Sequence, residues 1–333
     1  MNMATLTMAK AINMGLRNAM KRDEKVVLMG EDIGKLGGVF RVTDGLQAEF
    51  GDMRVVDPPL AESGIVGTAV GMAMRGWRPV VEIQFDGFVY PAFDQIVSQV
   101  AKHHYRSAGK TTLSMVIRIP FGGGIGAIEH HSESPEALFT HTAGLRVISP
   151  ANPVDAYEMI QQAIAHPDPI IFLEPKRRYW DKAEIDDSVD VMNKAEGYSR
   201  LFDARVAREG SDVTLVAYGP MVKTCLEAAA AAEGEGLSLE VIDLRSLTPL
   251  DVDTVVKSVT KTGRMVVVHE APQFGGVGAE IAARITEKCF WTMQAPVLRV
   301  SGMYMPYPAA RVEHAYLPDL DRILDSVDKA MEY

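Results

Sequence analysis

Short strand-like runs alternate with helical patterns along most of the chain, and this alternation constrains the fold more than any other feature of the sequence. In the first half, runs rich in β-formers lie at residues 26–29, 80–85, 113–119, 145–148 and 170–173. Helical patterns lie between them, the clearest at residues 93–106 and 154–166. Strands connected through helices pair in parallel and are covered on both faces. We therefore predict an α/β fold with a parallel sheet.

The same alternation returns in the second half of the chain. Strands are expected at residues 213–218, 239–244, 265–269 and 297–300, and helices at residues 221–233, 250–259, 278–290 and 318–331. Between the halves the sequence is polar and acid-rich, with Asp181, Glu184, Asp186, Asp187 and Asp190. We predict a first domain at residues 1–180, a linker at 181–207, and a smaller α/β domain at 208–333.

The first residues predict an amphipathic helix that belongs to the fold. Met8, Ile12, Leu16 and Met20 recur at i, i+4 spacing with basic residues between them, unlike a secretory signal. No apolar run approaches the ~20 residues that a membrane span needs. The two cysteines, Cys225 and Cys289, have neither disulfide-scaffold nor zinc spacing, which favours a reducing, cytoplasmic setting.

The charge of the chain argues against two classes of partner. Lys and Arg number 34 against 44 Asp and Glu, giving a net charge of −10. The longest basic run, residues 176–178, is flanked by Glu174 and Asp181. A surface for nucleic acid or for an anionic membrane is therefore not expected.

Two glycine-rich segments, residues 122–126 and 275–278, invite a nucleotide-site interpretation. Neither fits GxGxxG, and the chain has no GxxxxGK[ST]. We interpret both as tight turns in which the backbone approaches its neighbours closely.

Residues 62–73 predict an apolar helix with a ridge of small residues. Gly64, Gly67 or Thr68, and Gly71 lie at i, i+3/i+4 spacing, which lets another helix approach. The surface of the helix is apolar nearly all round, which predicts burial at a subunit interface. Glu62 opens this helix. It either complements the helix dipole or is a desolvated acid whose raised pKa suits proton transfer.

The segment after the first glycine-rich loop contains adjacent histidines, His130 and His131. Their spacing does not support a metal site, whereas one histidine near a loop-borne active site could act as an acid or base. Ser134 is predicted to be the N-cap of a following helix. His269 and Glu270 are interpreted as a strand-end turn rather than a catalytic pair.

Eight colinear blocks resemble one enzyme family. They are GEDIG at 30–34, PLAESGIVG at 59–67, EIQF at 82–85, YPAFDQI at 90–96, HSESPE at 131–136, GSDVTLVAYG at 210–219, VIDLR at 241–245 and HEAP at 269–272. From about residue 5 to its end, the chain resembles the β subunits of the decarboxylating components of branched-chain 2-oxo acid and pyruvate dehydrogenase complexes.

The resemblance implies an α2β2 thiamine diphosphate enzyme of the transketolase superfamily. In such enzymes the first domain of the β chain binds the aminopyrimidine, and the α chain holds the diphosphate and Mg²⁺. The GDG…N signature that holds the magnesium diphosphate is absent from this sequence. Half of the cofactor site is therefore expected on another chain.

Site residues follow from the resemblance by position. Glu62 matches the glutamate that hydrogen-bonds the pyrimidine ring nitrogen and so promotes removal of the thiazolium proton. Leu60, Gln84 and Phe88 match positions that contact the pyrimidine, although animal branched-chain enzymes have tyrosine where this chain has Phe88. His131 matches the histidine that assists reductive acylation of the lipoyl group.

Three further features follow from the resemblance. A K⁺ ion is implied near the backbone carbonyls of Met115, Ala163, Ile164, His166 and Asp168. Relatives read Gly-x-Asp-Thr-Pro-[Tyr/Phe]-Pro where this chain has Met303, Tyr304 and Met305 after Gly302. An acidic row could dock the lipoyl-bearing acyltransferase core or simply be a solvated helix face: Asp319, Asp321, Asp325, Asp328 and Glu332.

The expected activity is oxidative decarboxylation of a branched-chain 2-oxo acid, favoured by residues 131–136 and 174–176. Pyruvate or acetoin dehydrogenase is the alternative, because a pocket that differs by a methylene discriminates by only ~1 to 3 kcal/mol. A non-catalytic α/β interaction subunit is the alternative from another class. The presence of Glu62 favours the enzyme.

Overall fold

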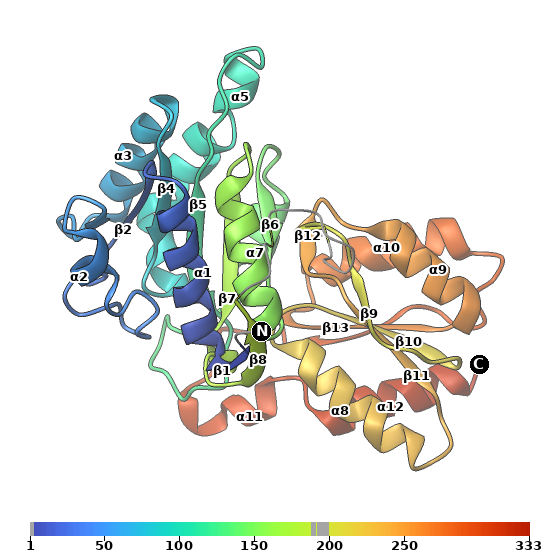
Figure 1. The fold of residues 1–333 in the computed structure, drawn as a ribbon. Coiled ribbons are helices and arrows are strands. Elements are labelled where there is room, and N and C mark those ends of the chain that lie inside the picture. The colour runs from blue at the N-terminus through green and yellow to red at the C-terminus, as the bar shows by residue number, and fades with distance from the viewer. Residues whose placement is uncertain (1–2, 188–190, 192–199) are drawn as a thin grey trace.

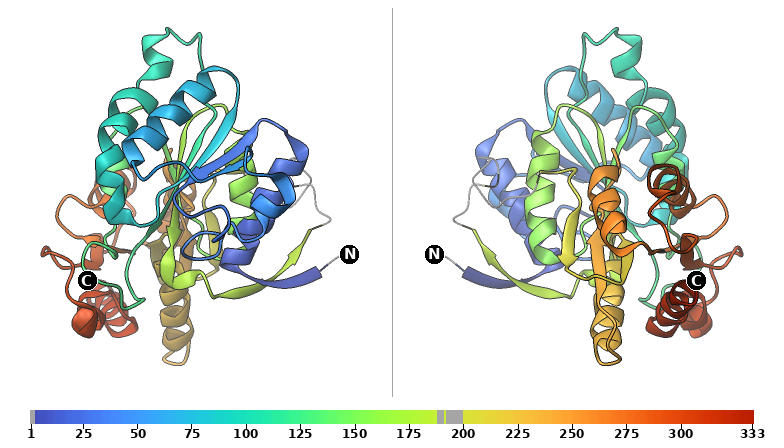
Figure 2. Two further views of the ribbon diagram at one scale, coloured as in Figure 1. Left: turned by 90° about the vertical axis from the view of Figure 1, so that its left-hand side faces the viewer. Right: turned by 90° about the vertical axis from the view of Figure 1, so that its right-hand side faces the viewer.

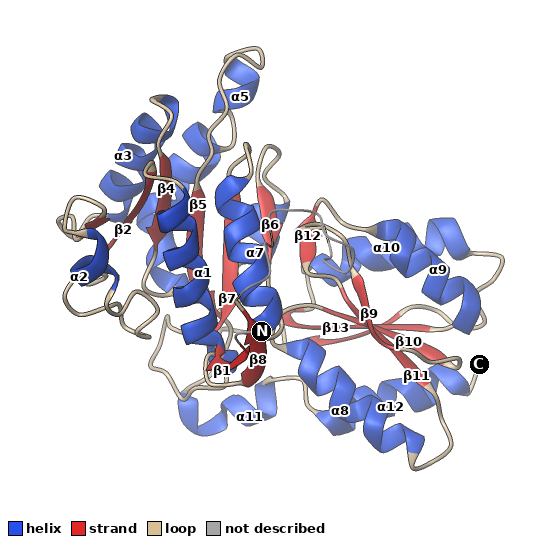
Figure 3. Ribbon diagram, in the orientation of Figure 1, coloured by secondary structure: helices blue, strands red, loops and turns tan. Residues whose placement is uncertain are grey.

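The computed structural model describes residues 3–187, 191 and 200–333. The chain forms two α/β halves that lie next to each other, and each half is built round its own sheet (Figure 1). Figure 3 shows helices packed on both faces of the strands in each half. The α/β class predicted from the alternation of strands and helices is confirmed.

The first sheet has seven strands in the order β12-β6-β7-β5-β4-β2-β3. Six strands from the first half of the chain pair in parallel: β2 (Val26–Gly30), β3 (Val55–Val56), β4 (Arg78–Glu82), β5 (Val116–Phe121), β6 (Arg146–Ile148) and β7 (Ile170–Pro175). The seventh, β12 (Ser246–Thr248), comes from the second half and pairs antiparallel with β6. The sequence pattern did not predict this exchange between the halves.

Successive strand residues of this sheet point to opposite faces, and each face packs on its own helices. Val26 and Leu28 pack with α1 (Met8–Arg22) and α7 (Pro153–Ala165), whereas Val27 and Met29 pack with α3 (Glu62–Met74). Figure 2 shows the helices on both sides of the sheet. The remaining helical segments of this half are α2 (Leu46–Phe50), a 3₁₀ turn (Asp86–Val89), α4 (Tyr90–Asp94), a π-helical segment (Gln95–Val100), α5 (His103–Arg106), α6 (Glu136–Thr140) and a 3₁₀ turn (Lys176–Arg178).

The predicted N-terminal helix is confirmed as α1. Thr7 caps it by accepting a hydrogen bond from the Lys10 amide at 3.4 Å. Gly15 is required where α1 crosses α7, because a Cβ atom there would lie 2.4 Å from Ile160 Cγ2. Helix α1 is therefore part of the hydrophobic core of the first half.

The second sheet has five strands in the order β14-β13-β10-β11-β9. They are β9 (Arg205–Arg208), β10 (Val213–Ala217), β11 (Leu239–Asp243), β13 (Met265–Pro272) and β14 (Leu298–Gly302), of which β9 alone runs antiparallel to its neighbour. Its helices are α8 (Met221–Glu233), α9 (Val252–Thr262), α10 (Val277–Cys289), α11 (Glu313–Tyr316), preceded by a 3₁₀ turn (Ala310–Val312), and α12 (Leu320–Met331).

The segment predicted to be a linker, residues 181–207, is more ordered than its composition suggested. It contains β8 (Lys182–Asp186), which pairs antiparallel with β1 (Met3–Thr7), and it ends within β9. Residues 188–190 and 192–199 of this prediction lie outside the described residues. The continuous helix predicted at residues 93–106 was wrong, because π-helical turns follow α4 and separate it from α5.

Within the described part of the chain, no helix combines the length and the apolar character that crossing a membrane requires.

Candidate functional site

The candidate site lies at the edge where the parallel strands β2, β4 and β5 end. Ligands bind at this edge of open α/β sheets, because the loops that follow the strands converge there. Gln84, two residues after β4, donates a hydrogen bond to the Glu31 carbonyl at 3.3 Å and another to Asp32 Oδ2 at 3.2 Å. The fold therefore brings the segments after β2 and β4 together.

Glu62 is the first residue of α3, and Ala61 before it provides no side-chain cap. Burial and then the nearby carboxylate of Glu62 raise the pKa of Glu31, so the two acids lie close together. Glu62 is half-buried, and Leu60 is 79% exposed. The desolvation that we expected for Glu62 is thus incomplete in the single chain.

The small-residue ridge of α3 faces outward. Ile65, Val66 and Ala69 pack into the core, whereas Gly64 and Gly71 are exposed. The single chain covers only one face of this helix, and the predicted burial of the other face at a subunit interface stays a prediction. Because the residues on the exposed face are small, a second helix can approach it closely.

His131 lies beside two aromatic rings in the loop that follows β5. Its ring centroid is 4.3 Å from that of Phe85 and 5.0 Å from that of Phe88, and its Nδ1 atom lies 2.8 Å from the Glu129 carbonyl. Gly87 permits this approach, since a Cβ atom there would lie 2.1 Å from the His130 carbonyl oxygen. Phe85, Phe88 and His131 thus form one aromatic cluster, and Gln84 precedes Phe85 in the chain.

A buried ion pair that the sequence analysis missed supports the His131 loop. The Lys176 ammonium donates to Asp86 Oδ1 and to the His131 carbonyl, and both side chains of the pair are fully buried. The Glu133 amide donates to Asp86 Oδ2 at 2.8 Å. Burial raises the pKa of Asp86 to about 7, against the opposing effect of the Lys176 charge.

Ser134 is not the N-cap that we predicted. The short helix α6 begins at Glu136, with Pro135 at its N-cap position and no side-chain cap. Glu136 instead accepts a hydrogen bond from the Tyr218 hydroxyl of the second half at 2.6 Å. Full burial raises the pKa of Glu136 to about 7.

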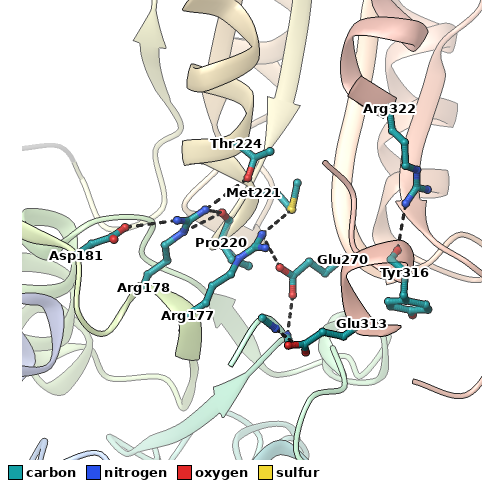
Figure 4. A network of polar contacts seen from close by, with 12 residues as sticks. Arg177, Arg178, Asp181, Pro220, Met221, Thr224, Glu270, Glu313, Tyr316 and Arg322 are labelled. Atoms are coloured by element: carbon teal, nitrogen blue, oxygen red, sulfur yellow. Dashed lines mark hydrogen bonds and ion pairs between the residues drawn. The ribbon is translucent and has the colours of Figure 1, made fainter. Parts of the chain in front are cut away.

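The interpretation of His269 and Glu270 as a strand-end turn was also wrong. Strand β13 continues through both residues to Pro272, where it pairs with Gly302 of β14. Glu270 is buried, forms an ion pair with Arg177 at 2.6 Å, and accepts a hydrogen bond from the Gly123 amide at 3.0 Å (Figure 4). A buried strand that runs up to a proline gave no signal in the sequence pattern.

The carbonyl groups implied for K⁺ lie around the amino-terminal ends of β5 and β7. Met115 O accepts from the Ile170 amide at 3.0 Å, Ala163 O from the His166 amide at 3.2 Å, and Ile164 O from Arg78 at 2.9 Å. Each carbonyl retains a second lone pair. Elsewhere in the described ranges, no group of three or more His, Cys, Asp or Glu residues could hold a metal ion.

Comparison with known protein families and structures gives matches over nearly the whole chain. The transketolase pyrimidine binding domain matches residues 4–181, and the transketolase C-terminal domain matches residues 203–323. A solved structure described as a split gene transketolase, inactive β4 tetramer, aligns with a TM-score of 0.77 at 23% identity, covering 98% of each chain. This likeness supports the fold.

Two curated relatives are much closer in sequence. The pyruvate dehydrogenase E1 component subunit beta of Leifsonia xyli is 57% identical, over 99% of this chain and 96% of its own length. The 3-methyl-2-oxobutanoate dehydrogenase subunit beta of Mycobacterium tuberculosis is 52% identical, over 98% of this chain and 92% of its own length. With both transketolase-type domains present in the expected order, the chain belongs to the family of 2-oxo acid dehydrogenase E1 component β subunits.

Proposed function

We propose that this chain provides one half of a thiamine diphosphate site and acts, together with an α subunit, in oxidative decarboxylation of a 2-oxo acid and acyl transfer to a lipoyl group. One observation supports this most strongly. Glu62, Gln84, Phe88 and His131 gather at the carboxyl edge of the first sheet, on a chain that lacks the magnesium diphosphate signature. A non-catalytic scaffold would have no need of this set.

The residues at this edge fit an aminopyrimidine ring. Leu60 offers exposed apolar surface, Phe88 offers a half-buried ring, and Gln84 offers an amide. Glu62 supplies a carboxylate on the first turn of α3. Thiamine diphosphate, when bound, supplies the carbon nucleophile that attacks the 2-oxo group.

Glu62 is proposed to hold a proton at the pyrimidine ring nitrogen. Its neighbour Glu31 has a raised pKa, caused first by burial and then by the charge of Glu62. The repulsion between the two carboxylates therefore favours the protonated form of Glu31. A partner surface that covers the exposed side of α3 would strengthen this effect by removing water.

His131 is proposed to assist acyl transfer to the lipoyl group. Its ring is half-buried at the mouth of the site, between the edge residues and the exposed tip formed by Ile128 and Glu129. An imidazole there can exchange a proton with a sulfur atom that arrives from outside.

We propose an α2β2 assembly in which the α subunit holds the diphosphate and Mg²⁺ and packs on the exposed ridge of α3. The acidic side chains of α12 and its ends are all exposed, which suits a basic module of the lipoyl-bearing acyltransferase core: Asp319, Asp321, Asp325, Asp328 and Glu332. Asp319 also caps α12 through the Arg322 amide at 2.9 Å, so its role is partly structural. The proposal also includes a K⁺ ion at the amino-terminal ends of β5 and β7. It further includes a cytoplasmic setting, which suits the two free, buried cysteines.

A branched-chain 2-oxo acid is the proposed substrate, supported by the relative named for 3-methyl-2-oxobutanoate. Pyruvate is the second candidate, supported by the 57% identity to a subunit named for pyruvate dehydrogenase. The choice depends on a pocket that the α subunit helps to build, where one methylene contributes about 1 to 3 kcal/mol.

The test is to assay the chain alone and with its co-expressed α subunit on pyruvate, 3-methyl-2-oxobutanoate and 4-methyl-2-oxopentanoate. We expect no turnover by the chain alone and thiamine-dependent decarboxylation by the pair, fastest with a branched acid. Turnover by the chain alone would disprove the shared site. Preference for pyruvate would reassign the substrate, and inactivity of the assembled pair on all three acids would contradict the enzyme assignment.

A further inference from the structure

Two glutamates of the second half of the chain accept hydrogen bonds from the glycine-rich loop that leads to His131. Glu313, the first residue of α11, accepts hydrogen bonds from the Gly124 amide at 3.1 Å and from the Gly126 amide at 2.8 Å. Glu270 accepts from the Gly123 amide at 3.0 Å. Figure 4 shows both glutamates converging on this loop from the second half of the chain.

The backbone of this loop turns sharply at three of its glycines. Gly122, Gly124 and Gly126 have φ angles of 78°, 86° and 67°, in the left-handed region that favours glycine. Turns of this kind leave backbone amides free to bind anions. Here the bound anions are carboxylates of the same chain.

Tyr307 fixes the carboxylate of Glu313. Its hydroxyl donates to Glu313 Oε2 at 2.9 Å, and its ring centroid lies 4.9 Å from that of Tyr316. A Cβ atom at Gly123 would lie 1.7 Å from the Tyr307 hydroxyl, so the loop and this tyrosine fit closely. Glu313 therefore accepts three hydrogen bonds from two segments.

The glycine-rich loop is continuous with the segment that contains His131. The Gly122 amide donates to the Glu133 carbonyl at 2.9 Å and so closes residues 122–133 into one loop. One limb of this loop is held by Glu313, and the other, at His131 and Glu133, by Lys176 and Asp86. If residues 122–126 move, the backbone between the Glu313 contacts and the Lys176 and Asp86 contacts must change as well. His131 lies in this part of the loop.

We infer that Glu313 is a positioning residue for His131, through which the second half of the chain sets the geometry of acyl transfer to the lipoyl group. The inference rests on the role proposed above for His131. Removing the Glu313 carboxylate frees two amides and releases the glycine limb, while Glu62 and Gln84 keep their own contacts. Acyl transfer is then impaired more than decarboxylation.

The first experiment compares Glu313→Ala with Glu280→Ala, an exposed glutamate of the same half that pairs with Arg284 on its own helix at 2.6 Å. The assembled α2β2 enzyme is assayed for decarboxylation with an artificial electron acceptor and for reductive acylation of a lipoyl domain. In Glu313→Ala we expect the ratio of acylation to decarboxylation to fall on the order of 10-fold, since small misplacements of reacting groups cost that much or more. An unchanged ratio overturns the inference.

A double-mutant cycle tests whether Glu313 acts through His131. In a His131→Ala background, Glu313→Ala is expected to add no further loss of acylation. Losses that multiply would show that Glu313 acts elsewhere. Tyr307→Phe, which removes one hydrogen bond and keeps the ring, should shift the ratio in the same direction by less, and it replaces Glu313→Ala if that variant does not fold.

Hydrogen exchange separates the failure of this inference from failure of the proposed function. Amides of residues 122–134 should exchange faster in Glu313→Ala than in Glu280→Ala, whether or not the enzyme decarboxylates any 2-oxo acid. Unchanged exchange would show that the Glu313 hydrogen bonds do not hold this loop in place. If the wild-type pair is inactive on every acid but exchange is faster in the variant, the proposed function is rejected. The role of Glu313 in holding the loop is then still supported.

Discussion

Glu136 is a carboxylate buried without a cationic partner among the described contacts. Its Oε1 atom accepts from the Tyr218 hydroxyl at 2.6 Å, and its Oε2 atom has no hydrogen-bond partner among them. Burial is the main reason why its pKa rises to about 7, and the carboxylate of Glu270 adds to the rise. The residue therefore links the pH of the solution to the contact between the two halves.

The sign of the pH effect follows from the raised pKa. The unfolded chain releases the Glu136 proton near its ordinary pKa of 4.5, whereas the folded chain retains it to about pH 7. The stabilising contribution is thus complete below about pH 4.5 and is lost as the pH rises through 7. Relative to wild type, Glu136→Gln should gain about 2 to 3 kcal/mol of unfolding free energy between pH 5 and pH 8.

Urea unfolding at the two pH values measures this difference. Glu280→Gln, at an exposed site, should show none. If wild type and Glu136→Gln differ equally at pH 5 and pH 8, the side chain is ionised in the folded state at both.

Glu62 gives the second prediction at the scale of single residues. Glu62→Gln should leave the fold intact, because the side chain is half-buried and makes no cap, yet lower decarboxylation by about 10²- to 10⁴-fold in the assembled enzyme. Circular dichroism and steady-state turnover check the two statements. Near-normal turnover in this variant would remove Glu62 from the chemistry.

The sequence identified some site residues and missed others for one physical reason. Glu62 and His131 were found because they lie in recognisable local motifs. Asp86 and Lys176 were missed because they are 90 residues apart and become a pair only when the loop after β4 meets the end of β7. Glu313 was missed because two of its three partners are backbone amides, and a backbone amide is not a property of any residue type.

At the scale of elements, periodic patterns predicted the long helices well and the short edge strands poorly. The i, i+4 apolar spacing of α1 and the strand runs of β10 and β11 were visible because burial on one or both faces imposes them. Strands β3 and β12 have only two and three residues, too few for any period to appear. Their pairing depends on neighbours far along the chain.

The exposed ridge of α3 gives a prediction at this scale. A Cβ atom added at Gly71 would meet no other atom within 4 Å, so Gly71→Leu should not disturb the single chain. It should block the close approach of a partner helix and prevent assembly with the α subunit. Ala230→Leu, an equally exposed position on α8, is the matched control.

Copurification of tagged α subunit and sedimentation velocity measure the assembly. We expect the Gly71→Leu chain to remain separate from the α subunit and the Ala230→Leu chain to assemble. Normal assembly of Gly71→Leu would place the partner on another surface.

At the scale of the whole molecule, the two halves are less independent than the sequence suggested. Strand β12 completes the first sheet, and Glu136, Arg177 and the glycine loop all contact the second half. A fragment of residues 1–187 would leave β6 as an unpaired edge strand, which favours edge-to-edge association. We expect this fragment to aggregate or to unfold at lower temperature than the full chain.

Size-exclusion chromatography and thermal unfolding of the fragment provide the measurement. Residues 203–333, which keep all five strands of the second sheet, serve as the comparison and should remain monomeric. A monomeric fragment 1–187 with the thermal stability of the full chain would show that β12 contributes little.

Strand β12 also bears on how the protein is made. Its last residue, Thr248, leaves the ribosome well after β6, so the first sheet stays unfinished until synthesis has passed residue 248. During that interval the growing chain displays a bare strand edge to its surroundings. Slow translation before Thr248 would prolong this exposure, and chaperone binding to nascent chains should end once that residue has emerged.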